Sequence, residues 1–590
     1  MSHMNDADPN QPITVTIDGI SVTVPAGTSI LDAAKKVGIS IPILCHHPDL
    51  SVRANCRICI VEAKGQRKFK TACSTEVWQG AEITTNSKTI REARKTVLEL
   101  ILAEHPRECL ECIRNGSCEL QKLAQDFGIK EVAFTPSRHV GELPIDDIHL
   151  AIVRNPNKCV KCGRCVEVCQ EVQTVRAINT AHRSHRYEIS TAFEKNLEET
   201  LCVSCGQCVA VCPVGALYEQ DETAKVWAAL DNPDLHVVVQ TAPAVRVALG
   251  EEFGMEPGSI FTGKMVAALR RLGFDKVFDT DFSADVTIME EGHELLERIQ
   301  TEGTLPLITS CCPGWINFAE EMYPELLPHL STCKSPQQMF GALVKTYYAQ
   351  KTGISPEKIF VVSIMPCTAK KYECARTEMN DSGYQDVDVV LTTRELAKML
   401  KQANVSVRDL PEETFDDPMG TSTGAAVIFG TSGGVMEAAL RTVYEVVTQK
   451  PLGNLDFTVV RGLTGIKEAE VELNGQTIKV AIANGLGNAR SLLEKIKEGQ
   501  VDYQFVEIMA CPGGCIGGGG QPFGTTMAKK HERMKAMYQV DKKLPIRQSH
   551  KNPSVVTLYK EFLEQPLSHK SHELLHTGYA SRNIDKEVKQ

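Results

Sequence analysis

The sequence predicts an α/β domain with mostly parallel sheets, preceded by small α+β modules that are rich in cysteine. Two patterns lead to this prediction. Of the 22 cysteines in the 590 residues, most are grouped in short runs before residue 213. From about residue 223, apolar runs typical of buried strands alternate with helical segments, as in a parallel sheet covered by helices. At about 150 residues per domain, the length indicates roughly four domains.

The composition excludes several classes of protein. A hydrophobic content of 42% and a charged content of 23% indicate a globular chain and not a disordered one. The net charge of −10 argues against nucleic acid as a partner. No apolar stretch reaches the roughly 18 residues of a membrane span, and the N-terminus lacks the pattern of an export signal. We therefore expect a cytoplasmic protein whose cysteines bind metal and do not form disulfides.

The first predicted module spans residues 12–90. Ile13 to Ile17 and Ser21 to Val24 alternate as strands around an Asp18-Gly19 turn, and a helical run follows from Ile30 to Val37. This order of elements resembles the β-grasp module of ferredoxins. The four thiols that follow suit a [2Fe–2S] cluster, with zinc as the alternative. They are Cys45, Cys56, Cys59 and Cys73.

The second predicted module spans residues 91–145. A helix predicted over residues 88–104 leads into one histidine and three cysteines: His105, Cys109, Cys112 and Cys118. By composition alone this set can hold zinc or an iron–sulfur cluster. It resembles the [4Fe–4S] module with one histidine ligand that is found in respiratory complex I. A polar linker is predicted at about residues 135–144.

The third predicted module, residues 146–222, contains an internal repeat. The runs are Cys159, Cys162, Cys165 and Cys169, and then Cys202, Cys205, Cys208 and Cys212. This is the spacing of bacterial two-cluster ferredoxins, in which the fourth cysteine of each run binds the other cluster. We therefore expect Cys212 to join the first three cysteines of the first run. Cys169 should join the first three of the second run, so that the module holds two [4Fe–4S] clusters.

The remaining residues, 223–590, show the strand and helix alternation. Strands are predicted at 236–240, 276–280, 305–309, 359–364, 386–391 and 503–508, and helices at 263–271 and 285–299. Five cysteines follow directly after three of these strands: Cys311, Cys312, Cys367, Cys511 and Cys515. Ligands of such sheets bind beyond the carboxyl ends of the strands, so these thiols can converge on one site. Four of them, Cys312, Cys367, Cys511 and Cys515, suffice for a cubane cluster.

Glycines support a bulky cofactor at this site. Between Gly513 and Gly520 six residues are glycine, and they surround Cys515. Because glycine has no Cβ atom, we expect this loop to let the backbone approach the cofactor closely. Gly485 to Asn488 could suggest a nucleotide loop, but the third glycine of that motif is missing, so a helix start is expected there.

Three motifs carry a specific resemblance. They are Thr309 to Trp315 (TSCCPGW), Met365 to Glu373 (MPCTAKKYE) and Glu507 to Cys515 (EIMACPGGC). These motifs resemble the signature sequences of [FeFe]-hydrogenases, and the upstream modules resemble the accessory-cluster domains of the larger family members. The resemblance implies the reaction 2H⁺ + 2e⁻ ⇌ H₂ at an H-cluster. This cofactor is a [4Fe–4S] cubane joined through a cysteine to a two-iron unit with CO, cyanide and an amine-bridged dithiolate.

The resemblance also implies residue roles. Cys312, Cys367, Cys511 and Cys515 would hold the cubane, with Cys515 bridging to the two-iron unit. Cys311 would be the free thiol that exchanges protons with the bridging amine, and Lys370 would bind a cyanide. The pocket would be lined by Pro243, Gln337, Met365, Phe429 and Met509, with Ala244 at a position where some members have a serine that binds cyanide.

A proton route is implied in the same way. Glu290, Glu291 and Glu294 lie on one predicted helix, followed by Arg298. Their spacing alone favours an ordinary solvated helix face. The resemblance instead implies a relay through Glu294, Ser331, Glu291 and Cys311. Cys333 and Cys374 match no ligand role and are interpreted as core or surface thiols.

The predicted cofactors are an H-cluster, three accessory [4Fe–4S] clusters and one [2Fe–2S] cluster, which together use 19 of the 22 cysteines. Besides H₂ and protons, the expected partners are flavin-binding and iron–sulfur subunits of an NAD(P)-linked complex, with or without electron bifurcation. The alternative is a self-sufficient, ferredoxin-dependent enzyme. Two other classes were considered. The cysteines at the strand ends argue against a simple electron-transfer subunit, and the absence of an obvious signalling domain argues against a hydrogen sensor.

Overall fold

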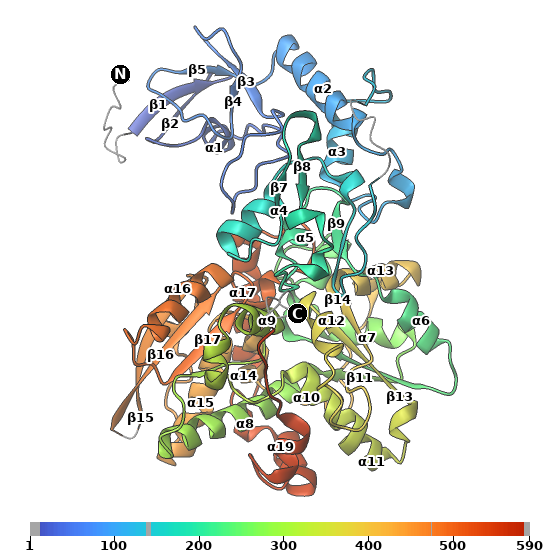
Figure 1. Cartoon of the computed structure of the whole chain (residues 1–590), viewed down its shortest axis with the longest axis vertical. Coiled ribbons are helices and arrows are strands. Elements are labelled where there is room, and N and C mark those ends of the chain that lie inside the picture. The colour runs from blue at the N-terminus through green and yellow to red at the C-terminus, as the bar shows by residue number, and fades with distance from the viewer. Residues whose placement is uncertain (1–11, 137–142, 474, 583–590) are drawn as a thin grey trace, which may run out of the picture.

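The computed structural model describes residues 12–136, 143–473 and 475–582. The N-terminal modules lie at one end of the long axis and the larger α/β region at the other (Figure 1). The predicted fold class is confirmed, because parallel strands form the core of the larger region and small mixed modules precede it. Residues 1–11 and the centre of the predicted linker, residues 137–142, lie outside the described residues.

The first module is a five-stranded sheet with the order β2-β1-β5-β3-β4. Its hairpin turns at Asp18 and Gly19, both of which have positive φ angles, as the sequence predicts. Helix α1 (Ile30–Lys36) starts at Ser29, whose hydroxyl accepts a hydrogen bond from the Asp32 backbone at 3.0 Å. The strands are β1 (Pro12–Ile17), β2 (Ile20–Pro25), β3 (Ile60–Ala63), β4 (Lys70–Thr71) and β5 (Glu82–Thr84).

Two helices, α2 (Lys88–Ala103) and α3 (Glu119–Asp126), flank the second group of cysteines. The repeat that follows is also a structural repeat. Helices α4 (Arg164–Glu167) and α5 (Gln207–Val211) each begin at a glycine with positive φ, Gly163 and Gly206. Two antiparallel ribbons complete the module: β6 (Ile152–Arg154) with β9 (Leu217–Glu219), and β7 (Asn179–Ala181) with β8 (Glu188–Ser190).

The larger region contains two four-stranded sheets. The first has the order β11-β10-β13-β14 and is parallel throughout. Its central strands are runs of buried valine and isoleucine, as expected for a sheet covered by helices on both faces. The strands are β10 (His236–Thr241), β11 (Lys276–Asp279), β13 (Ile359–Met365) and β14 (Val389–Thr392), and nearby helices are α6 (Thr223–Leu230), α7 (Thr262–Leu272), α10 (Pro336–Leu343), α11 (Ala349–Thr352), α12 (Ala369–Cys374) and α13 (Thr393–Gln402).

The second sheet has the order β12-β17-β16-β15. Strand β15 pairs with β16 as an antiparallel hairpin, which the sequence analysis did not predict, and the other pairs are parallel. The predicted strand at 305–309 is only two residues long. The elements are β12 (Leu307–Ile308), β15 (Ile466–Leu473), β16 (Gln476–Asn484) and β17 (Phe505–Met509), with helices α9 (Pro313–Met322), α14 (Gly424–Val427), α15 (Gly434–Thr448) and α16 (Leu486–Lys497).

Helix α8 (Thr280–Gln300) starts earlier than predicted because Asp279 caps it. The Asp279 carboxylate accepts a hydrogen bond from the Asp281 backbone at 3.1 Å. The long helix packs against both α10 and α15, so it connects the helices of the two sheets. Fourteen of its 21 residues are buried, including three glutamates.

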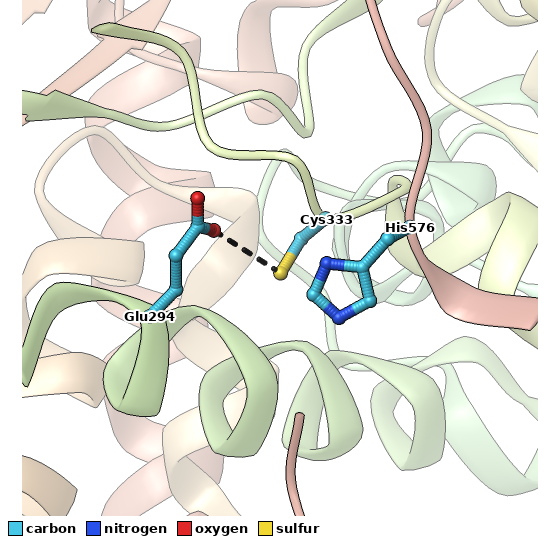
Figure 2. Close-up of side chains that lie close together, drawn as sticks. All are labelled: Glu294, Cys333 and His576. Carbon is cyan, nitrogen blue, oxygen red and sulfur yellow. Dashed lines mark hydrogen bonds between the residues drawn. The ribbon is translucent and has the colours of Figure 1, made fainter. Parts of the chain in front are cut away.

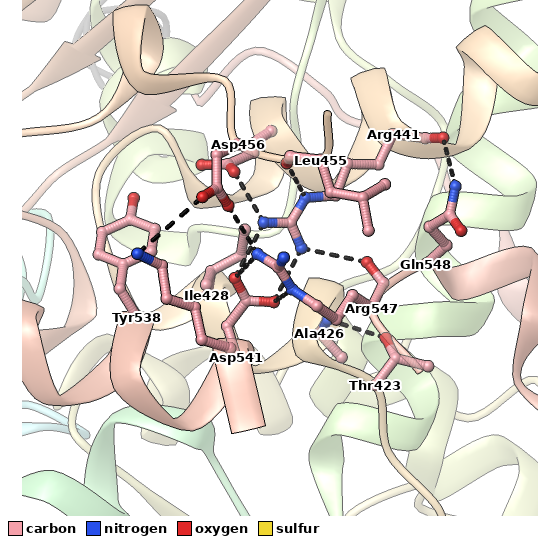
Figure 3. A network of polar contacts seen from close by, with 12 residues as sticks. Thr423, Ala426, Ile428, Arg441, Leu455, Asp456, Tyr538, Asp541, Arg547 and Gln548 are labelled. Carbon is pink, nitrogen blue, oxygen red and sulfur yellow. Dashed lines mark hydrogen bonds and ion pairs between the residues drawn. The ribbon is translucent and has the colours of Figure 1, made fainter. Parts of the chain in front are cut away.

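The C-terminal segment wraps back onto the larger region through α17 (Met527–Lys543), α18 (Pro553–Leu558) and α19 (His569–Leu575). A buried network of ion pairs holds α17 against α15 (Figure 3). The Arg441 guanidinium contacts Asp541 at 2.9 Å and Glu437 at 2.7 Å, and Arg547 contacts Asp541 at 2.6 Å. Since a buried charge without its partner is strongly destabilising, this network fixes the segment in one position.

None of the helices in the described residues is long and apolar enough to cross a membrane.

Candidate active site

A cavity of roughly 80 Å³ lies where the carboxyl ends of strands from both sheets meet. Pro243 follows β10, Cys312 follows β12, Cys367 follows β13 and Cys511 follows β17. The predicted convergence of the strand-end cysteines is therefore present in the geometry. The lining includes Ala242, Pro243, Thr280, Cys311, Cys312, Pro313, Pro336, Gln337, Met365, Pro366, Cys367, Lys370, Phe429, Met509, Cys511, Gly514, Cys515 and Gly518.

The four cysteines expected to hold the cubane all line this cavity. Burial raises the pKa of each thiol, that of Cys515 to about 12. The thiols therefore keep their protons until a metal replaces them, and bound metal ions lower such pKa values strongly. Four sulfur donors around one buried space are the ligand set of a cubane cluster, so the residues present fit this cofactor.

Five predicted pocket residues, Pro243, Gln337, Met365, Phe429 and Met509, also line the cavity. The Gln337 side-chain oxygen is buried and has no hydrogen-bond partner among the described residues, which leaves it available to a bound group. Ala244, the other predicted pocket residue, is not among the lining residues. It is fully buried in an apolar cluster with Val427, Ile516 and Met537.

The glycines of residues 513–520 have a different role from the expected one, which was to let the backbone approach the cofactor. Gly514 and Gly518 border the cavity, but a Cβ atom on Gly518 would lie 2.1 Å from the Pro366 carbonyl oxygen. One on Gly519 would lie 2.5 Å from the Cys205 carbonyl oxygen. The missing side chains therefore make room mainly for backbone of other segments, including the two-run module.

Lys370 enters the cavity from α12. Its ammonium group donates to the Cys311 carbonyl at 3.1 Å and to the Glu373 carboxylate at 2.9 Å. Burial opposes the charge, but Glu373 outweighs it, and the pKa of Lys370 is raised. Glu373 is a further residue of the site that was not predicted, and its spacing of three residues from Lys370 on a helix is the signal in the sequence that pairs the two. Glu373 also accepts a hydrogen bond from Gln337 at 3.0 Å.

Cys311 lines the same cavity and belongs to no set of four thiols. Burial raises its pKa well above the usual value, and the nearby Glu291 carboxyl adds to this shift. Burial, followed by the charge of Glu294, raises the pKa of Glu291 to about 8. Near pH 7 both groups are therefore mainly protonated and can donate as well as accept protons.

The other relay residues continue this line outward. Ser331 interacts with Glu291, and its hydroxyl donates to Glu294 at 2.7 Å. Arg298 then contacts Glu294 at 2.7 Å from the solvent side. All four predicted relay residues, Cys311, Glu291, Ser331 and Glu294, are thus neighbours in the order that the resemblance implied. Cys333 is fully buried, and its thiol lies 3.8 Å from Glu294, while Cys374 is buried at the end of α12, where its thiol donates to the Lys371 carbonyl.

The accessory cysteines form separate groups. In the first module, the sulfurs of Cys59 and Cys73 are 3.4 Å apart, and Cys45 interacts with Cys56. In the second, Cys112 and Cys118 interact, and burial lowers the pKa of His105 to about 4. The Nδ1 atom of His105 is buried without a partner among the described residues, which fits a neutral metal ligand.

The two-run module pairs its cysteines across the repeat. One cavity is lined by Cys159, Cys162, Cys165 and Cys212, the set expected for one cluster. In the other set, the charges of Cys202, Cys205 and Cys169 each raise the pKa of Cys208, after burial as the main cause. In each set, the fourth cysteine therefore comes from the other run.

Protein-family models match almost the whole chain. The large matches are "iron only hydrogenase large subunit, C-terminal domain" over residues 235–519 and "iron hydrogenase small subunit" over residues 527–582. The N-terminal matches are a 2Fe-2S cluster binding domain (10–88), the NADH-ubiquinone oxidoreductase-G iron–sulfur binding region (94–133) and the ferredoxin-like domain of NADH-quinone oxidoreductase subunit 3 (151–218).

Known proteins agree with these matches. The chain is 51% identical to the NADP-reducing hydrogenase subunit HndD of Solidesulfovibrio fructosivorans, over 97% of this chain and 99% of that protein. It is 40% identical to iron hydrogenase 1 of Clostridium pasteurianum, over 96% and 99%. A solved variant of [FeFe]-hydrogenase HydA1 from Chlamydomonas reinhardtii matches with a TM-score of 0.56 and 46% identity, covering 62% of this chain and all of that one. The chain belongs to the iron-only, or [FeFe], hydrogenases, enzymes that interconvert H₂ with protons and electrons.

Proposed function

We propose that this chain is the hydrogen-converting subunit of an NAD(P)-linked complex, with its H-cluster held by Cys312, Cys367, Cys511 and Cys515. The observation that carries this proposal is the single buried cavity in which these four thiols meet Cys311 and Lys370. When bound, the H-cluster supplies the iron centre at which H₂ is cleaved and formed. The protein must then hold it, keep water away and move protons and electrons.

The residues that line the cavity perform the first two of these tasks, which are to hold the cofactor and to keep water away. Met365 and Met509 are buried apolar side chains that line the cavity beside Phe429, so bulk water has little access. Lys370 provides a fixed positive charge for anionic ligands such as cyanide. Glu373 and the Cys311 carbonyl hold the ammonium group in place, and the side-chain oxygen of Gln337 remains free to accept a hydrogen bond.

Protons would pass between the cavity and the protein exterior through Cys311, Glu291, Ser331 and Glu294. The contact of Ser331 with both glutamates supports this order. A serine hydroxyl donates one proton and accepts another, so it can connect two carboxyl groups. The raised pKa of Glu291, about 8, supports its role because a proton carrier works best near the operating pH.

Electrons would reach the cavity from the two-run module, whose second set of cysteines lies nearest. The Thr368 hydroxyl, next to Cys367, donates to the Ser204 carbonyl, next to Cys205, at 2.7 Å. Gln173 donates to the Ala510 carbonyl, next to Cys511, at 2.9 Å. These buried contacts support a fixed connection between the two sites. We assign two [4Fe–4S] clusters to this module, one more to His105, Cys109, Cys112 and Cys118, and a [2Fe–2S] cluster to the first module.

The partners are inferred from the relatives. HndD is named as a subunit of an NADP-reducing hydrogenase, and two N-terminal modules match parts of NADH-oxidising complexes. We therefore assign flavin-binding and iron–sulfur partner subunits, a cytoplasmic location and reversible electron transfer between H₂ and NAD(P), with ferredoxin as a second acceptor in a bifurcating complex. The 51% identity to a subunit of this kind favours it over the self-sufficient, ferredoxin-dependent alternative.

Two measurements test this function. Infrared spectra of the matured enzyme should contain CO and cyanide stretching bands, and a Cys312→Ala variant should lose them. An affinity-tagged chain purified from its natural host should bring flavin with it, and the complex should reduce NAD(P) with H₂. Bands without flavin, together with direct reduction of ferredoxin, would support the self-sufficient enzyme. A chain that lacks the bands after maturation would not be a hydrogenase.

A further inference from the structure

The outer end of the proposed proton path is closed by a group that cannot carry protons. Glu294 is only 5% exposed. On its solvent side it contacts Arg298, whose guanidinium also donates to the carbonyls of Leu330 and Pro328 at 2.7 and 3.2 Å. Arginine keeps its proton in proteins, so Arg298 orients Glu294 but does not exchange protons with it. The path therefore needs another titratable group beside Glu294.

His576, from the segment after α19, lies at this place. A ring nitrogen of His576, the Cys333 sulfur and an oxygen of Glu294 all lie within 4.8 Å of one another (Figure 2). The Nδ1 atom of His576 also hydrogen-bonds the Thr332 hydroxyl at 2.8 Å, and the Thr332 backbone donates to Glu294 at 3.2 Å. The Cys333 thiol, which lies 3.8 Å from the Glu294 carboxylate, thus stands between the imidazole and the carboxylate.

Glu290 holds the other side of the imidazole. Its carboxylate lies 3.2 Å from the Nε2 atom of His576 and accepts hydrogen bonds from Tyr559 at 2.5 Å and Ser571 at 2.6 Å. Burial opposes ionisation of Glu290, but these hydrogen bonds outweigh it and lower the pKa of this carboxyl. The Glu290 carboxylate therefore fixes the position of the His576 ring, and a histidine held in this way is suited to carry a proton next to Glu294.

The ring is also connected to the surface. His572, one turn earlier on α19, is exposed, and its ring centroid lies 4.3 Å from that of His576. The titratable groups that face His576 are Glu290 and Glu294 from α8, Cys333 from the loop after α9, and His572 from α19. Among these, only the histidines ordinarily change charge between roughly pH 5 and 8.

We propose that His576, held by Glu290, is the group through which Glu294 exchanges protons with solvent. This inference rests on the proton path proposed above. In the direction of H₂ formation, the imidazolium loses a proton toward the Glu294 carboxylate, giving a neutral imidazole and a carboxylic acid. Cys333 passes the proton by accepting one from the imidazolium and releasing its own to Glu294, and solvent returns a proton to the imidazole through His572. His576 does not touch the reacting atoms and is a positioning residue of the relay.

The test uses the full-length, matured enzyme. In His576→Gln, turnover should fall by about 10²-fold, the lower end of the usual effect of a positioned proton-transfer group, while iron content stays unchanged. The variant should also lose an ionisation between roughly pH 5 and 8 from its pH–rate profile. In His576→Ala, added imidazole should restore part of the rate. His569→Gln makes the same change on an exposed face of α19 and should leave turnover unchanged.

A second readout does not depend on turnover. The infrared carboxyl band of Glu294, assigned by its loss in Glu294→Gln, should titrate at a higher pH in His576→Gln, because a neighbouring positive charge is gone. Glu290→Gln removes the carboxylate that holds the ring, should lose the same ionisation from the pH–rate profile, and serves if His576→Gln does not fold. The proposal would be overturned if the wild type is active and these variants keep both its pH–rate profile and its Glu294 titration. An inactive wild type would contradict the proposed function instead, and the infrared titration would still decide the role of His576.

Discussion

The two halves of the chain assemble their metal-binding thiols in opposite ways. In the N-terminal half, the cysteines of each group lie within one small module, and even the two groups that exchange a cysteine between runs lie between Cys159 and Cys212, shaped by local turns at glycines with positive φ. In the larger region, Cys312 and Cys515 are more than 200 residues apart and meet only because strands of two sheets end at the same cavity. Local sequence therefore defines the first kind of site, and the whole fold defines the second.

The largest expected effect comes from a residue of the cavity that belongs to no ligand set. Cys311→Ala should leave iron content intact and lower turnover by about 10²- to 10⁴-fold, because a proton-transfer group is lost. Iron analysis and hydrogen-evolution assays check this. Cys374→Ala removes a buried thiol outside the cavity and should leave turnover unchanged. Retained full activity in Cys311→Ala would contradict the proposed proton role.

The next effect concerns the charge pair at the cavity wall. Lys370→Met leaves the Glu373 carboxylate buried without its partner, which should lower the free energy of unfolding by about 3–5 kcal/mol. Thermal denaturation of the protein before maturation measures this loss. The double variant Lys370→Met/Glu373→Gln should recover most of it. If the double variant is as unstable as the single one, the pair is not the cause.

A smaller effect is expected where the two halves touch. Gly519→Ala forces a Cβ atom against the Cys205 carbonyl and should cost about 1–3 kcal/mol, as overpacking generally does. It should also slow electron transfer from the reduced accessory clusters. Rapid-freeze electron paramagnetic resonance measures this rate. Gly453→Ala has open space around its Cβ position and is the matched control. Equal behaviour of the two variants would show that the contact is not tight.

The smallest effect is a pH dependence of stability. Because the pKa of Glu291 is about 8 in the folded protein and near 4.5 for the free group, the folded state binds an extra proton between these values. This contribution to stability is present at low pH and is lost as the pH rises through 8. Between about pH 7 and 9 the wild type should lose about 1 kcal/mol that Glu291→Gln keeps. Identical pH dependence of melting in both proteins would contradict the raised pKa.

The fold class and most of the residues that line the cavity could be predicted from the sequence. Cysteine spacing identified the accessory groups because their members are close in sequence, and the strand-end rule brought Cys312, Cys367 and Cys511 together. Resemblance added Lys370, Glu291 and the pocket residues. The division into two sheets was not predicted, and strand β15, which forms the edge of the second sheet, has one exposed face and a weak apolar pattern.

Other features depend on contacts that no local pattern encodes. His576 reaches Glu294 across more than 280 residues, and nothing in its own neighbourhood marks it. The glycine loop was correctly identified as a place of close approach, but the approaching atoms are largely backbone of Pro366 and Cys205. Ala244 follows Pro243 in the turn after β10 and is buried in an apolar cluster with residues of distant segments, which its own neighbourhood in the sequence does not predict.

The distribution of the cavity cysteines along the chain sets an order for synthesis. A ribosome finishes every accessory cysteine by position 212, before the first strand of the larger region has emerged. The last cavity cysteine, Cys515, follows only when translation is nearly complete. Accessory iron can therefore be loaded onto a nascent chain. The cavity, in contrast, has all four of its cysteines only when the chain is nearly complete, so its cluster can be bound only then.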